Sequence, residues 1–345
     1  MIRKNESADY NLELKKLNSE GPGKLYFVFG KEDYLRNLFV SKLREICIGT
    51  EEGFGYYKFN GIPEEQELLN AVDTIPFLTE KSFIEITSCD ANKIPENIIG
   101  ILSELPDYVC VCLVADSEFE PDSRLKSVKF IKSNASYLEF SSQSSDKLLK
   151  WVEKRFAAHN VKIESNAIQR LIFVSGEYMN GLIPEIEKLS AYCSSGIVTV
   201  EDVNRIAHHI PESKTFELAN LISEKKYNAA VAYLSEILGD RDNSPLGVIA
   251  SLGYTFRQLF AVRLAIRQKL SVSEIMKIIG TNSDYRAKLV IGSAKNFSIP
   301  QLRSIIKRIV ESEYRFKTSQ ISENEILTDL VVMMIAEDKV GKTIG

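Results

Sequence analysis

Histidine and tryptophan are scarce in this sequence, with three His and one Trp among 345 residues. His159 and the pair His208–His209 stand near the ends of expected helices, where a favourable contact with the helix dipole is the ordinary role of such a residue. Neighbours on a helix point to different faces, so the pair is not expected to share a metal ion. No Ser-His-Asp or Cys-His spacing occurs either. The sequence therefore predicts no catalytic residue and no metal site.

Cysteine is also sparse and shows neither disulfide-framework nor metal-ligand spacing. The five cysteines are Cys47, Cys89, Cys110, Cys112 and Cys193. No apolar run reaches membrane-spanning length, and the first residues lack the apolar segment of a signal peptide. Together these absences predict a cytoplasmic protein without a membrane partner.

What is present is the composition of a globular protein, 44% hydrophobic and 26% charged, in a chain too long for one ordinary domain. The formal net charge of −4 is unevenly spread. Residues 211–345 hold 19 Lys and Arg against 15 Asp and Glu, whereas the remainder holds 24 against 32. A mildly basic C-terminal region is compatible with a nucleic-acid surface but does not require one.

Strand-like and helix-like patterns alternate in the first 140 residues. Continuous apolar runs such as Leu25–Phe29 and Tyr108–Val114 are typical of strands buried on both faces. Helical spacing separates them, for example over Asp33–Cys47 and Glu64–Ile75. This alternation predicts βαβ units, hence a parallel sheet covered by helices, which is an α/β domain over residues 1–140.

After Ser141 the strand patterns stop and the remaining chain reads as helical. A polar linker over residues 141–146 caps the next helix, and a small helical domain is expected over residues 141–210. Pro211 then begins a second helical region that continues over residues 211–345. The fold class predicted is α/β plus all-α, in three domains.

The turn after the first strand invites comparison with a phosphate-binding loop. It reads Gly30-Lys31-Glu32-Asp33, with one glycine, no run of small residues and no hydroxyl after the lysine. A triphosphate needs inward backbone amides and positive charge, and two carboxylates would repel it. We therefore expect no nucleotide at this turn, no ATP hydrolysis and no cofactor.

The connection between the second helix and the next strand carries large apolar residues. The helix over Glu64–Ile75 runs into Pro76, which has no amide hydrogen and disfavours helical backbone at the residue before it. Phe77 and Leu78 are then expected at the tip of the connection. Apolar side chains at a tip either fold back onto the core or are kept for a partner, and the pattern alone favours folding back, because apolar residues are usually inside.

Basic residues recur on the long helices of the last region. Arg257 lies on one of them, and Arg303 and Lys307 lie four apart on another, where they share a helix face. A solvated surface and a stripe facing phosphate or another subunit are both compatible with this spacing.

Several strings taken together resemble one family, the delta subunit of the bacterial DNA polymerase III clamp loader. They are LYFVFGKEDYLRNLFVSKL, AVDTIPFLTEKSFIEI, GEYMNGLIPEIEKLSAY, VTVEDV, FELANLISEKKYNAAVAYLSEIL and SPLGVIASLGYTFRQLFAVRLA, spread over residues 22–335. The resemblance implies a RecA-like domain of AAA+ type, a helical lid and a helical collar. It also implies assembly with the motor subunits (tau/gamma) and delta-prime, binding to the sliding clamp (beta), and contact with primed DNA through the complex.

The same resemblance assigns roles to residues. The hydrophobic pair with which the family plugs the clamp's pocket falls on Phe77 and Leu78, in reversed order from the frequent Leu-Phe, with Ile75 and Pro76 shaping the approach and Val72 behind them. The degenerate turn Gly30–Asp33 implies a subunit that opens the clamp without hydrolysing ATP, the polymerase activity belonging to the assembly. The region Lys132–Ala135 has no arginine, so no arginine finger is implied. Arg257, Arg303 and Lys307 are candidates for DNA or subunit contacts. A degenerate ATPase and a helical adaptor in another assembly remain the alternatives.

Overall fold

The computed structural model describes residues 8–49, 55–194, 196–240 and 243–340. Contacts divide the chain into two units, one running to Gln143 and including Tyr178–Asn180, the other beginning at Ser144. This boundary lies close to the one predicted between residues 140 and 141. The predicted division at 210/211 falls inside the second unit and stays a prediction; residues 1–7 and 341–345 of the predicted domains lie outside the described part.

Within the described residues the first unit is built on a five-stranded sheet whose strands are all parallel, in the order β2-β3-β4-β1-β5. The strands are β1 (Leu25–Phe29), β2 (Tyr56–Asn60), β3 (Ser82–Thr87), β4 (Val109–Val114) and β5 (Ser136–Glu139). Every residue of β1 and β4 is buried. Both strands are apolar throughout because, as predicted, a central parallel strand is covered on both faces.

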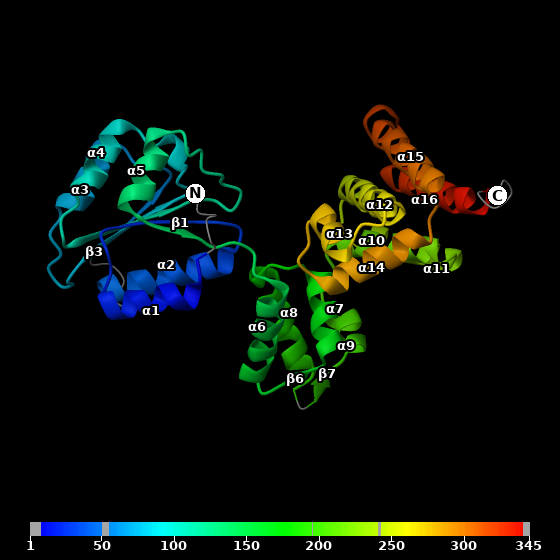
Figure 1. Ribbon diagram of the computed structural model, residues 1–345, viewed down its shortest axis with the longest axis horizontal. Helices are drawn as coiled ribbons and strands as arrows, with labels where there is room; N and C mark the ends of the chain where they lie inside the picture. Colours follow the sequence, from blue (N-terminus) through cyan, green and yellow to red (C-terminus); the bar gives the residue numbers. More distant parts are fainter. Residues whose placement is uncertain (1–7, 50–54, 195, 241–242, 341–345) are drawn as a thin grey trace. The chain divides into compact units, whose positions relative to one another are not determined.

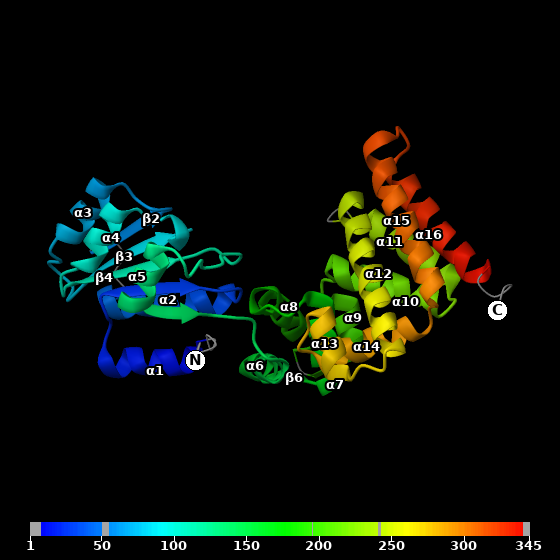
Figure 2. The same cartoon turned by 45° about the horizontal axis from the view of Figure 1, so that its top comes forward.

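Helices cover both faces of this sheet (Figure 1). One face carries α3 (Glu65–Asp73), α4 (Glu96–Ser103) and α5 (Lys126–Asn134), with the short η1 (Ala91–Lys93) beside α5. The other carries α2 (Asp33–Ile48), and α1 (Tyr10–Glu20) packs on α2 (Figure 2). The sequence pattern did not predict α1, because Leu17 is its one buried residue.

The second unit begins with α6 (Ser145–Ala158), α7 (Ser165–Ser175), α8 (Met179–Tyr192) and α9 (Val200–Ile206), of which α8 starts with residues that belong to the first unit. Two short strands, β6 (Lys162–Ile163) and β7 (Ile197–Val198), pair in parallel. The expectation that strands stop after Ser141 is therefore wrong: two residues are too few to produce a periodic pattern.

The remaining helices are α10 (Pro211–Ser223), α11 (Tyr227–Gly239), α12 (Pro245–Arg267), α13 (Val272–Ile279), α14 (Asp284–Lys295), α15 (Ile299–Thr318) and α16 (Glu323–Val340). Five of them, α10, α13, α14, α15 and α16, contact α12, whereas α11 packs on α10 and α16. Leu252, Phe256 and Leu259 of α12 are fully buried. A helix covered on several sides is apolar around most of its circumference, as α12 is.

Candidate functional site

The connection between α3 and β3, residues 74–81, is held at both of its ends. At its start, the Thr74 hydroxyl donates to the carbonyl of Asn70 (2.7 Å), and α3 ends at Asp73, two residues earlier than predicted. At its end, the Thr79 hydroxyl donates to the carbonyl of Lys81 (2.9 Å), and Lys81 Nζ donates to the carbonyl of Asp107 (2.7 Å). The residues between these anchors form a short connection whose two ends are fixed.

Three large apolar side chains project from this connection. Phe77 is 96% exposed, Ile75 72% and Leu78 58%. The folded-back arrangement that the residue pattern alone favours would have buried them, so that interpretation is wrong and the side chains are exposed. Apolar side chains grouped on a surface mark a site for a partner more often than isolated ones do.

Val72 differs from the other residues assigned to this site. It is 4% exposed and belongs to the apolar core with Leu68 and Ala71 of the same helix. Its side chain therefore anchors α3 to the sheet and is not part of the exposed surface. We call the exposed segment Ile75–Leu78 the apolar tip.

The turn after β1 is closed by its own domain. Gly30 has a φ of 114°, and a Cβ there would lie 2.4 Å from the carbonyl oxygen of Phe140. The amide of Glu32 donates to that same carbonyl (2.9 Å), while Arg36 Nη1 donates to the carbonyl of Gly30 (2.7 Å). A phosphate loop instead leaves several amides free to point at the ligand.

Glu32 itself is fully buried. Its Oε1 accepts a hydrogen bond from the backbone amide of Met179 (3.2 Å), a residue of the same unit. Burial raises the pKa of Glu32, the hydrogen bond from the Met179 amide lowers it, and the charge of nearby Asp33 raises it further. The resulting pKa is about 7. The turn after β1 thus carries a buried carboxyl group that resists ionisation.

A hollow of about 330 Å³ lies beside this turn, at the ends of β1 and β5. Lys31 lines it together with three glutamates, Glu118, Glu120 and Glu139. Acidic walls oppose the binding of a polyphosphate.

The basic residues singled out on the C-terminal helices are all exposed. The Arg257 guanidinium lies over Gly253 of its own helix, on the side near Ile309 of α15. Arg303 and Lys307 share a face of α15, and Lys307 Nζ lies 3.8 Å from Glu311 Oε1. The structure thus places the three residues on two helices that pack against each other.

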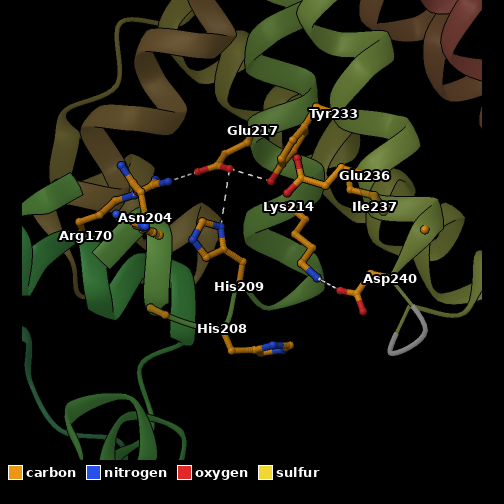
Figure 3. Close-up of a pocket in the computed structure, with 13 residues that line it drawn as sticks. Arg170, Asn204, His208, His209, Lys214, Glu217, Tyr233, Glu236, Ile237 and Asp240 are labelled. Atoms are coloured by element: carbon orange, nitrogen blue, oxygen red, sulfur yellow. Dashed lines mark hydrogen bonds and ion pairs between the residues drawn. The ribbon is translucent and has the colours of Figure 1, made fainter. Parts of the chain in front are cut away.

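A polar cluster in the second unit was not predicted (Figure 3). Arg170 of α7 pairs with Glu217 of α10, and the Tyr233 hydroxyl donates to Glu217 Oε2 (2.8 Å). His209 Nδ1 lies 3.8 Å from the same oxygen. The prediction that His209 ends a helix is wrong, because α9 stops at Ile206. Arg170 and Glu217 are 47 positions apart, so no local pattern connects them.

Two further expectations concern metals and membranes. Among the described residues, no group of three or more His, Cys, Asp and Glu side chains could hold a metal ion. None of the helices in that part of the chain is long and apolar enough to cross a membrane.

The parallel sheet with strand order β2-β3-β4-β1-β5 and the helical regions that follow it define an α/β plus all-α fold of the AAA+ type, RecA-like in its first domain. The predicted fold class is confirmed. Two family profiles match the chain, the DNA polymerase III delta subunit over residues 26–141 and its C-terminal domain over residues 212–335. The chain belongs to the DNA polymerase III delta subunit family.

Individual relatives agree with this assignment. The chain is 22% identical over 325 residues to the DNA polymerase III subunit delta of Bacillus subtilis, covering 90% of this chain and 92% of that one. It is 22% identical over 334 residues to the probable delta subunit of Aquifex aeolicus, covering 93% of each. The solved structure of the Bacillus subtilis DNA clamp loader delta protein superimposes with a TM-score of 0.63 at 20% identity, covering 95% of this chain and all of that one.

Proposed function

We propose that this chain is the clamp-binding subunit of a bacterial clamp loader, which docks its apolar tip in a pocket of the sliding clamp. The observation that carries the proposal is the 96% exposure of Phe77 between two other exposed apolar residues. A protruding aromatic anchor that fills a pocket supplies much of the affinity of an interface. Fixed ends at residues 74 and 81 reduce the freedom that the segment would lose on binding.

Opening the clamp requires no chemistry from this chain. A partner shifts an equilibrium by its difference in affinity for the two states. Tighter binding of the apolar tip to a strained clamp interface than to a closed one therefore favours the open ring. The motor subunits (tau/gamma) and delta-prime are the proposed companions, with ATP acting through the motor subunits and primed DNA bound by the complex.

The direct test of docking uses purified protein. Titration calorimetry of this chain with the sliding clamp of the same organism should give a saturable complex without nucleotide. A peptide of residues 71–82 should compete for the same clamp surface, whereas a peptide with Ala at positions 77 and 78 should not. The docking proposal fails if the full chain shows no binding.

We further propose that the chain alone hydrolyses no ATP, because the turn at Gly30 is closed on Phe140 and the neighbouring hollow is acidic. Purified protein with Mg²⁺ and ATP should release phosphate at the buffer rate, and Lys31→Ala should not change this rate. Turnover above the buffer rate that is lost in Lys31→Ala would instead support a degenerate ATPase.

The exposed cations Arg257, Arg303 and Lys307 are proposed to serve the assembled loader, either at a neighbouring subunit or on DNA phosphate. Removing one cation that neutralises a phosphate should reduce the slope of log affinity against log salt by about 0.9. The triple change to Gln should therefore flatten the salt dependence of DNA binding or, if the partner is a subunit, weaken assembly measured by size exclusion. Unchanged assembly together with an unchanged salt slope would remove both roles.

A further inference from the structure

A cavity of about 730 Å³ lies in the second unit, among residues of α7, the end of α9, α10 and α11 (Figure 3). Its volume is within the range of small-molecule sites. It involves neither the apolar tip nor the turn at Gly30, so the proposed function leaves it unassigned. The residues that decide its chemistry are Arg170, Asn204, Arg205, His209, Glu217 and Glu236.

Two of the three acidic side chains that line the cavity are already paired with cations. Glu217 accepts from Arg170 and from Tyr233, and Asp240 accepts from Lys214 Nζ (2.7 Å). Burial alone would raise the pKa of Glu217, but neighbouring His209, the Arg170 charge and the Tyr233 hydroxyl together hold it at about 2. Glu217 is thus ionised at neutral pH, and its charge is offset by Arg170 within the protein.

Three other side chains that line the cavity can donate hydrogen bonds to a ligand through their N–H groups. His209 Nε2 is buried and has no hydrogen-bond partner among the described residues. Asn204 uses its Oδ1 to accept from Arg170 Nε (2.6 Å), which leaves its NH₂ group available. Arg205 lines the cavity, lies 6.0 Å from the Tyr192 ring, and its charge contributes to the lowered pKa of Asp202.

His209 is placed to connect this donor set to the buried carboxylate. Figure 3 shows its ring pointing toward Glu217, which Nδ1 approaches to 3.8 Å. The other ring nitrogen, Nε2, can donate a hydrogen bond to a ligand when it carries a proton. The exposed acid Glu236 lies beside Tyr233, across Glu217 from Asn204, so it does not occupy the donor side.

We infer that this cavity binds the phosphate group of a small phosphate monoester, with Arg205, the Asn204 amide and His209 Nε2 as its donors. Arginine forms charge-assisted hydrogen bonds to phosphate oxygens with a fork that matches the geometry of that group, and amide and imidazole N–H groups donate to the remaining oxygens. A phosphate alone would fill a small part of 730 Å³, so the rest of the cavity accommodates the attached organic moiety.

The test uses the full chain and ribose 5-phosphate, with ribose as the uncharged control. Calorimetry should detect ribose 5-phosphate but not ribose, and sulfate should compete. Arg205→Gln and His209→Gln should each weaken binding at least tenfold. Arg267→Gln, which removes an exposed arginine from the last turn of α12, should leave binding unchanged.

Arg205 is exposed, so its removal should leave the melting temperature unchanged and keep the test interpretable if His209→Gln is unstable. No saturable binding of ribose 5-phosphate or sulfate at millimolar concentration would overturn the inference. So would binding that Arg205→Gln leaves unaltered. Clamp binding measured on the same preparations separates this result from the proposed function, because the apolar tip belongs to the other unit.

Discussion

Replacing Phe77 and Leu78 together by alanine is expected to weaken binding to the sliding clamp roughly a thousandfold. Truncating a hot-spot residue costs about 2 kcal/mol or more, and two such losses correspond to on the order of 4 kcal/mol. The same change should hardly affect folding, because both side chains are already exposed in the free protein. Calorimetry or surface plasmon resonance with immobilised clamp measures the loss directly.

The matched control for this variant is Leu12→Ala. Leu12 is 52% exposed on α1, close to the 58% of Leu78, and lies outside the apolar tip. Its removal should leave clamp affinity within twofold of wild type, and the melting temperature should agree for all three proteins. Equal binding by wild type and the double variant would show that the clamp recognises another surface.

Glu32→Gln is expected to stabilise the first unit at pH 8, by a margin that disappears near pH 4. The pKa of Glu32 is about 7 in the folded protein and near 4.5 in the unfolded chain. The folded state therefore holds its proton more tightly, and its stability falls as the pH rises from 4.5 through 7. The linkage corresponds to on the order of 3 kcal/mol at pH 8. Glutamine removes this dependence, because it carries no ionisable group.

Glu217→Gln, in the second unit, is a control variant whose effect on the pH dependence of stability should have the opposite sign. The pKa of Glu217 is lowered to about 2, so its contribution is present above pH 4.5 and lost as the pH falls through 2. This variant should be destabilised at pH 7 and approach wild type in acid. Trp151 fluorescence follows the second unit, and hydrogen exchange at β4 amides follows the first. A Glu32→Gln difference that stays constant from pH 4 to pH 8 would contradict the assigned burial.

The sheet could be predicted from the sequence because its central strands are apolar throughout. Val109–Val114 contains no polar residue, so it shows neither the 3.6-residue period of a surface helix nor the alternation of a half-exposed strand. A strand covered on both faces was therefore the interpretation that fitted the pattern. Helix α1 could not be predicted in this way, because Leu17 is its one buried residue and a single apolar position shows no period. Pairing between β6 and β7 depends on residues far apart in the chain, which a local pattern does not record.

The apolar tip was predictable in part. Pro76 located the end of the helix within two residues, and the resemblance to the delta family, rather than periodicity, selected exposure over burial for Phe77. Burial of Glu32 could not be predicted, because a charged residue at a turn is ordinarily solvated. The same holds for Arg170 and Glu217, which tertiary packing alone brings together.

Ring opening by the isolated chain is the most direct measure of the central claim. A clamp labelled with a donor and an acceptor fluorophore across one subunit interface reports opening as a loss of energy transfer. Adding this chain without ATP should lower the transfer efficiency, and the variant with alanine at positions 77 and 78 should leave it unchanged. An unchanged signal with saturating wild-type protein, or an equal drop with the variant, would contradict the account.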